Sequence, residues 1–279
     1  MNIDFQKLVI QKHVIDSSTH EKSKKLSVAY GVDRNFLFGS GISMTSVLVN
    51  NPDIDIHFYI VTDYIDDDYL KSVKRLTQMY STTVTVLVFD NAAFRELPST
   101  KAWTYAMYYR YFAFEYLSTE LNSVLYLDAD VICKGPLDHL LNLDLNDNVA
   151  AVVKDVDSIQ SRVNERLPSF NLQGRYFNSG VVLINLRQWA EHRLTERALS
   201  LLTGEDGNAI FFKYPDQDVL NILLRDKVYF LPREYNTIYT IKSELSDKTH
   251  EKYLDVIHAE TKLIHFTGAT KPWHAWANY

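Results

Sequence analysis

Two aspartates follow a short apolar run in the segment LYLDADVICK, which spans Leu125–Lys134. Asp128 and Asp130 are separated by one residue, Ala129, and in an extended chain positions i and i+2 project to the same side. Two carboxylates held this close repel each other unless a cation lies between them. The spacing therefore suits a hard divalent cation such as Mg²⁺ or Mn²⁺, which takes oxygen ligands and completes its shell with water or substrate phosphate.

The motif alone leaves three interpretations open. An aspartate after a strand is often a turn residue or a helix N-cap. A strand ending in Asp-x-Asp also occurs in haloacid-dehalogenase-like phosphatases, where the first aspartate attacks phosphorus. In nucleotide-sugar glycosyltransferases the same pair holds a metal against a diphosphate. The phosphatase motif ends the first strand of its core domain and needs a later acidic pair. Here the motif follows several strand signals, and no convincing later pair exists.

The end of the chain offers a third candidate ligand. In LIHFTGATKPWH, which spans Leu263–His274, His265 interrupts an apolar strand pattern. A lone histidine there is more often a hydrogen-bonded core residue than a ligand. However, Gly268 permits close backbone approach, and Lys271 supplies a point charge for phosphate. An imidazole beside such a loop is a candidate third metal ligand.

These residues must be positioned by alternating apolar strands and helices. We expect strands over 26–30, 54–63, 83–90, 123–130, 149–153, 180–186, 228–231 and 263–266. We expect helices over 36–49, 66–80, 103–117, 187–202 and 216–225. This alternation predicts an α/β fold with a mainly parallel sheet, whose ligands bind beyond the carboxyl ends of the strands. Asp33 and the aspartate pair both follow strands, so we expect them on one rim. The polar stretch 16–25 is typical of an exposed loop.

Composition narrows the class of protein. The chain has 279 residues, 46% of them hydrophobic, and a formal net charge of −6. That suits one globular domain with an accessory subdomain, and the acidic balance argues against a broad nucleic-acid surface. Cys133 is the single cysteine, which excludes an intramolecular disulfide and suits a reducing compartment. The sequence shows neither a signal peptide nor an apolar run long enough to span a membrane.

Four separated blocks resemble glycosyltransferase family 8, retaining enzymes of the GT-A fold that use UDP-sugars. Within that family the chain resembles the bacterial lipopolysaccharide core α-1,3-galactosyl-, α-1,3-glucosyl- and 1,2-glucosyltransferases. The blocks are VAYGVDRNF (28–36), LYLDADVICKG (125–135), YFNSGVVLINLRQW with KYPDQDVLN (176–189 and 213–221), and LIHFTGATKPWH (263–274). The resemblance implies a Rossmann-like, mainly parallel sheet flanked by helices, with a smaller region on the acceptor side. We expect an N-terminal extension over 1–25 and a single GT-A domain over 26–279.

The resemblance also implies a donor site. Asp128, Asp130 and His265 would be ligands of Mn²⁺ or Mg²⁺ bridging the UDP diphosphate. Further contacts to UDP-sugar are implied for Gly31, Val32, Asp33 and Asn35 at uridine, Arg110 toward the sugar and diphosphate, Ala129 in the Asp-x-Asp segment, Asn178 and Ser179 at the sugar, and Gly268 and Lys271 at the diphosphate. Plainer interpretations exist: Asp33 in a turn, Arg110 stacked on tyrosines, and Asn178 in a turn.

Asp216 and Gln217, together with Asp130, are implied to be catalytic. Asp216 follows a proline, so it is also a good N-cap; by resemblance it binds sugar hydroxyls. Gln217 would face the anomeric carbon opposite the departing UDP. Because an amide oxygen is a poor nucleophile, we favour front-face attack, in which Gln217 stabilises an oxocarbenium-like transition state. Asp155 is expected to help orient the acceptor.

The implied reaction moves galactose or glucose from UDP-galactose or UDP-glucose to a sugar of the lipopolysaccharide outer core. The acceptor is lipid-linked, so we expect a peripheral enzyme on the cytoplasmic face of the bacterial inner membrane. Relatives dock there through a basic, aromatic-rich tail, which we expect to be missing from a chain that ends in HAWANY. A non-catalytic nucleotide-sugar-binding module is the remaining alternative, and the intact set of ligands argues against it. Glucose and galactose differ at C4 alone, and the sequence does not decide between them.

Overall fold

The computed structural model describes residues 5–19, 22–95, 97–99, 104–204, 211–249, 251 and 253–274. Trp103, with which one expected helix begins, and residues 275–279 lie outside the described residues. Within the described part of the chain, none of the helices combines the length and the hydrophobicity that crossing a bilayer requires.

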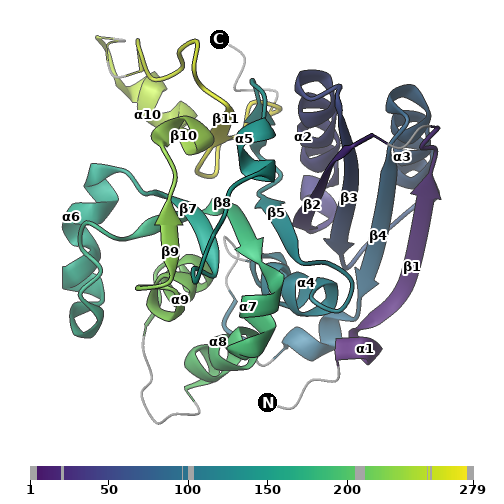
Figure 1. The fold of residues 1–279 in the computed structure, drawn as a ribbon. Helices are drawn as coiled ribbons and strands as arrows, with labels where there is room; N and C mark the ends of the chain where they lie inside the picture. Colours follow the sequence, from purple (N-terminus) through teal and green to yellow (C-terminus); the bar gives the residue numbers. More distant parts are fainter. Residues whose placement is uncertain are drawn as a thin grey trace.

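An eight-stranded sheet runs through the molecule (Figure 1). In spatial order its strands are β1 (Val9–Asp16), β4 (Thr83–Phe89), β3 (Ile54–Thr62), β2 (Lys24–Val32), β5 (Ser123–Leu127), β8 (Phe177–Asn185), β7 (Ala150–Lys154) and β9 (Val228–Phe230). The four strands from β4 to β5 are parallel, whereas β1 pairs antiparallel with β4, and β8 runs antiparallel to both β5 and β7. The expected α/β fold with a mainly parallel sheet is confirmed.

Helices cover both faces of this sheet. The first face packs α2 (Leu37–Asn50), α3 (Asp67–Tyr80) and α5 (Asp138–Leu141), and the second packs α1 (Phe5–Leu8), α4 (Tyr109–Leu117), α6 (Asp157–Arg166), α7 (Leu186–Glu191), α8 (Leu194–Thr203) and α9 (Pro215–Leu223). Side chains alternate between the two cores along the central strands: in β2, Val28 and Tyr30 join the first, and Ala29 joins the second. Parallel strands buried on both faces are apolar almost throughout, which is why they stand out in the sequence.

A second, three-stranded sheet stands at one end of the large one. Its spatial order is β10 (Thr237–Tyr239), β11 (Leu263–Phe266) and β6 (Val131–Cys133), with α10 (Ile241–Ser246) following β10. β11 pairs parallel with β10 and antiparallel with β6. In Figure 1 this small sheet lies far from β1. It joins β11, a strand late in the chain, to β6, the strand that follows β5.

Several expected elements differ in the structure. β1 lies within residues 1–25, where no strand was expected, because an edge strand with exposed Ile10 and Val14 lacks a clean buried face. The helix expected over 187–202 is two helices, α7 and α8, which meet at Arg193 in a left-handed conformation, φ +50°. The helix expected over 103–117 is a 3₁₀ turn, Tyr105–Tyr108, followed by α4. β6, β10 and the helices α5, α6 and α10 carried no recognised sequence signal.

Candidate active site

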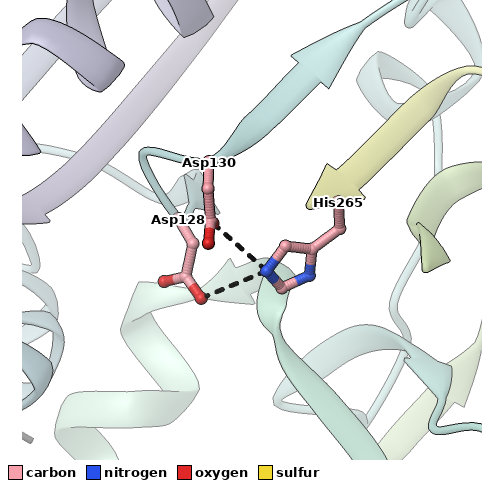
Figure 2. A group of neighbouring side chains, drawn as sticks. All are labelled: Asp128, Asp130 and His265. Atoms are coloured by element: carbon pink, nitrogen blue, oxygen red, sulfur yellow. Dashed lines mark ion pairs between the residues drawn. The ribbon is translucent and has the colours of Figure 1, made fainter. Parts of the chain in front are cut away.

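Asp128, Asp130 and His265 converge at the rim of the large sheet, and we call them the ligand trio (Figure 2). One candidate ligand atom from each lies within 4.8 Å of the others. His265 Nε2 is 3.2 Å from Asp130 Oδ1 and 3.8 Å from Asp128 Oδ2. Figure 2 shows the imidazole edge turned toward both carboxylates. Two carboxylates and an imidazole form a donor set suited to a divalent transition-metal ion or Mg²⁺.

The strand expected over 123–130 ends at Leu127, so both aspartates lie in a turn and not in an extended chain. The turn is closed by a hydrogen bond from Val131 N to Asp128 O at 3.1 Å. β11 then pairs with β6, with His265 opposite Val131. This antiparallel register places His265 beside Asp130, across 135 positions of sequence.

The charges around Asp130 favour its ionised form. Its Oδ2 accepts a hydrogen bond from Lys271 Nζ. Burial by itself would raise the pKa of Asp130, but His265 and Lys271 lower it well below its ordinary value. Asp130 Oδ1 is buried and, apart from the ion-pair contact with His265 Nε2 at 3.2 Å, has no hydrogen-bond partner within the described part of the chain. Because buried carboxylate oxygens are normally hydrogen-bonded, this oxygen fits a cation ligand.

Arg110 joins Asp128 to Asp216. Its Nη2 donates to Asp128 Oδ1 at 2.8 Å and lies 3.0 Å from Asp216 Oδ2, while its Nη1 donates to Ser179 O at 2.7 Å. The guanidinium also lies over the Tyr126 ring, 4.6 Å from its centroid. Arg110 therefore stacks on Tyr126 and also forms ion pairs with Asp128 and Asp216. Burial raises the pKa of Asp216 even though Arg110 opposes the shift.

Gln217 is held by hydrogen bonds at both ends of its amide. Its Oε1 accepts from Ser179 N at 3.0 Å and from Asn178 Nδ2 at 3.2 Å. Its Nε2 donates to Asp155 Oδ2 at 2.9 Å, and burial raises the pKa of Asp155. All four side chains are buried, so Gln217 has one orientation.

Two plainer interpretations of this region are wrong. Tyr214, not Asp216, is the N-cap of α9, and Asp216 lies inside its first turn after Pro215. Asn178 and Ser179 lie in β8 and not in a turn, because the strand begins at Phe177, earlier than expected.

The predicted uridine loop lies apart from the trio but at the same rim. Gly31 and Val32 end β2, which pairs with β5, so the strands that precede Asp33 and the aspartate pair are neighbours. The Asp33 carboxylate accepts from Asn35 N at 2.9 Å and from Thr104 Oγ1 at 3.0 Å. The bond to Asn35 N forms the turn that the plainer interpretation of Asp33 predicted. Together the two bonds fix the direction of the Asp33 carboxylate.

The loop after β11 folds back over the trio. Gly268 has a φ of +91°, a conformation that glycine adopts without strain. Lys271 Nζ donates to Phe266 O at 3.0 Å as well as to Asp130, which holds its ammonium at the site. The Trp273 ring packs against Gly39, and the Ala129 carbonyl oxygen also contacts this glycine.

Two residues that shape the trio were not predicted from the sequence. A Cβ added to Gly180 would lie 2.1 Å from His265 Cε1 and 2.8 Å from Asp128 Oδ2. Asn236 Oδ1 lies 3.2 Å from His265 Nδ1. Gly180 belongs to the block FNSG, but the sequence around it does not show that the glycine leaves room for the His265 ring, which comes from a distant part of the chain. Asn236 stands in an unpatterned stretch.

Comparisons with known proteins agree with this geometry. The sequence model of Glycosyl transferase family 8 matches residues 27–277. A lipopolysaccharide 1,2-glucosyltransferase of Escherichia coli (strain K12) is 51% identical over 257 residues, which cover 92% of this chain and 75% of that protein. A lipopolysaccharide 1,3-galactosyltransferase of Salmonella typhimurium (strain LT2) is 36% identical over 279 residues, which cover 99% of this chain and 81% of that protein.

The fold is also that of a solved glycosyltransferase. The galactosyltransferase LgtC, in complex with donor and acceptor sugar analogues, superposes with a TM-score of 0.74 at 23% identity, covering 90% of each chain. The fold is therefore GT-A. The phosphatase and non-catalytic alternatives find no support in these matches. A family match over nearly the whole chain, relatives above one-third identity and the shared fold lead to one conclusion: this chain belongs to glycosyltransferase family 8.

Proposed function

We propose that this protein transfers a hexose from a UDP-sugar to a sugar of the lipopolysaccharide outer core, with retention of configuration and with a divalent cation. The observation that carries the proposal is the convergence of Asp128, Asp130 and His265 within 4.8 Å. The relatives supply the substrate class, because those at 51% and 36% identity are named lipopolysaccharide glucosyl- and galactosyltransferases.

We favour UDP-glucose as the donor. Two relatives, at 51% and 42% identity, are both named lipopolysaccharide 1,2-glucosyltransferase, whereas the one named 1,3-galactosyltransferase is 36% identical. UDP-galactose is the second candidate. One hydrogen-bonding group at C4 of the sugar is enough to separate the two donors.

The ligand trio would hold the cation, and Mn²⁺ is preferred to Mg²⁺ because one of the three ligands is a nitrogen. When bound, the cation supplies charge neutralisation at the diphosphate as UDP departs. Lys271 and the Gly268 backbone would bind the diphosphate from the loop above. Gly31, Val32, Asp33 and Asn35 would hold uridine, with the Asp33 carboxylate accepting from the uracil N–H, and Ala129 would line the donor between the two aspartates.

At the sugar, the chain's own groups favour front-face attack. Gln217 Oε1 already accepts two hydrogen bonds, which makes an amide oxygen a still weaker nucleophile. Gln217 would therefore stabilise positive charge at the anomeric carbon, while the leaving phosphate oxygen takes the acceptor proton. Asp216, held by Arg110, would bind sugar hydroxyls together with Asn178 and Ser179. Asp155 anchors Gln217 and would orient the acceptor from there.

The setting of the enzyme is also a proposal. We infer one catalytic domain over 26–279, to whose sheet β1 and the start of β2 add residues from the N-terminal extension. This domain would act on a lipid-linked acceptor at the cytoplasmic face of the inner membrane. The support is the substrate class of the relatives, since both are lipopolysaccharide enzymes by name.

The test is a donor panel with UDP-glucose and UDP-galactose, in which UDP release is measured with and without acceptor oligosaccharide. We expect release that stops in EDTA, returns on adding Mn²⁺, and is abolished by Asp130→Ala. Full activity in EDTA would refute the three-ligand site. Phosphate release from a phosphomonoester, independent of any UDP-sugar, would revive the phosphatase interpretation. Product linkage then follows from NMR of the extended oligosaccharide.

A further inference from the structure

Five buried side chains form a continuous hydrogen-bond chain behind the ligand trio, and we call it the amide relay. Its members, in order, are Asp155, Gln217, Asn178, Asn236 and His265, and each is at most 9% exposed. The donor–acceptor distances along it are 2.9, 3.2, 2.9 and 3.2 Å. The relay links a carboxylate beyond the sugar site to the nitrogen ligand of the trio.

Backbone N–H groups fix the direction of two of the three amides in the relay, those of Gln217 and Asn178. Ser179 N donates to Gln217 Oε1 at 3.0 Å, and Gly180 N donates to Asn178 Oδ1 at 3.0 Å. A backbone N–H can only donate, so the side-chain oxygen must face it in both cases. Flipping either amide would point two donors at each other in a buried place, where an unmade hydrogen bond is costly.

The fixed direction reaches His265 through Asn236. Because Asn178 Oδ1 is an acceptor, Asn236 must turn its Nδ2 toward it, and the contact is 2.9 Å. Asn236 Oδ1 therefore faces His265 Nδ1. A carbonyl oxygen only accepts, so Nδ1 must carry a proton, and the lone pair of the neutral imidazole lies on Nε2. Nε2 is the nitrogen that faces both aspartates.

We propose that Asn236 is a positioning residue, which presents His265 Nε2 as the cation ligand and ties that ligand to Gln217 through one rigid relay. This inference rests on the cation site of the proposed function. Asn236 is fully buried and would act through His265, without touching the substrate. Its place is set by the 3₁₀ turn Arg233–Asn236, which leads directly into β10, the strand that pairs with β11.

The experiment compares two substitutions at Asn236 by Mn²⁺ binding, measured by electron paramagnetic resonance on protein without UDP-sugar. Asn236→Leu removes the acceptor at similar volume, and we expect Mn²⁺ affinity to fall roughly ten- to a hundredfold. Asn236→Asp keeps an oxygen for His265 Nδ1–H but loses the donor to Asn178 Oδ1. We therefore expect a lower unfolding midpoint, with Mn²⁺ affinity within about threefold of wild type, or tighter, since a carboxylate supports a ligating imidazole well. If Asn236 had a purely structural role, Asn236→Asp would not restore Mn²⁺ affinity.

Asn185→Leu is the matched control. Asn185 caps α7 through a hydrogen bond from Gln188 N at 3.1 Å, at the opposite end of β8 from Asn178. This variant replaces an asparagine of β8, the strand that also carries Asn178, and leaves every hydrogen bond of the relay in place. We expect a lower unfolding midpoint by circular dichroism and wild-type Mn²⁺ affinity.

Four results would overturn the inference, and the last of them would also remove the cation site on which the proposed function rests. Wild-type affinity in Asn236→Leu, or equal losses in both Asn236 variants, would show that the acceptor oxygen does not matter. If Asn236→Leu does not fold, Asn236→Asp decides alone, and a loss of more than about tenfold there refutes the inference. Absence of Mn²⁺ binding in the wild-type protein would remove the cation site, and the inference with it.

Discussion

The two halves of the large sheet differ in the polar side chains that they bury. In the parallel half, from β4 to β5, the strand interiors are largely apolar: Val28, Ile60 and Val86 are all 0% exposed. In the other half, β8 and α9 bury Asn178 and Gln217 beside the small sheet that carries His265. In the first half, apolar contacts hold the side chains and have no preferred direction. In the second half, the arrangement of the buried side chains depends on the direction of each hydrogen bond.

This contrast separates what stabilises the protein from what orients its site. Apolar burial is proportional to area and tolerates rearrangement. Buried amides and carboxylates need partners at the right angle, and an unpaired one is costly. We therefore expect substitutions in the parallel half to change the free energy of unfolding, and substitutions in the polar half to change metal binding and catalysis.

Gly180→Ala should give the largest effect. A Cβ there would lie 2.1 Å from His265 Cε1 and 2.7 Å from Nδ1, so the ring must leave the trio. We expect Mn²⁺ affinity and UDP release to fall at least about a hundredfold. The control is Gly41→Ala in α2, where the added methyl meets nothing within 4 Å; it should keep full activity and gain about 0.5–1 kcal/mol in unfolding free energy. Wild-type Mn²⁺ affinity in Gly180→Ala would refute the packing argument.

Ile60→Ala should damage the parallel half alone. Ile60 is fully buried in β3, so truncation should cost about 2–5 kcal/mol of unfolding free energy, measured by urea titration. Mn²⁺ affinity of the folded fraction should match the wild type. Val49→Ala on the exposed face of α2 serves as the control, with a change within about 0.5 kcal/mol. A weakened cation site in folded Ile60→Ala would show that the halves are coupled.

Gln217→Ala tests whether the polar half acts in the chemistry. If Gln217 stabilises charge that exists only in the transition state, kcat should fall about a hundredfold with KM for UDP-glucose little changed. Steady-state kinetics at saturating Mn²⁺ measures both parameters. A rise in KM at constant kcat would instead assign Gln217 to uniform binding of the donor.

Asp138→Asn should have the smallest effect. Asp138 pairs with Lys24 at the surface, where both side chains are about half exposed. Exposed ion pairs add little because water and salt screen them, so the urea midpoint and UDP release should both stay at wild-type values. A clear loss of stability would mean that surface charge, as well as the apolar interior, holds this half of the sheet.

Sequence patterns anticipated the parallel half well because its signals are local. Apolar runs such as 54–62 and 83–89 announce strands that are buried on both faces. The aspartate pair and His265 were also identified, since carboxylates at a strand end are conspicuous. The extended chain expected to hold the pair together was wrong, however. Asp128 and Asp130 converge through a turn between two strands, which an alternation rule for extended chains does not describe.

The family resemblance assigned Gln217, Asn178 and Arg110 to the site. No sequence pattern, however, shows how these residues are hydrogen-bonded to one another and to the trio. Asp128 meets Asp216 through one guanidinium group, and Gln217 meets His265 through two asparagines. Each of these links joins residues from different elements. Their partners are set by strand pairing and helix placement, so the connections exist only in the folded chain.

The sequence by itself determined the α/β class, the strands of the parallel half and the chemical types at the site, because hydrophobic periodicity and side-chain chemistry are properties of short segments. Tertiary structure alone decided which nitrogen of His265 faces the aspartates, why Gly180 must lack a side chain, and how Asn236 enters the site. Those features depend on the direction of hydrogen bonds and on contact between atoms far apart in the chain, and neither is written in any local pattern.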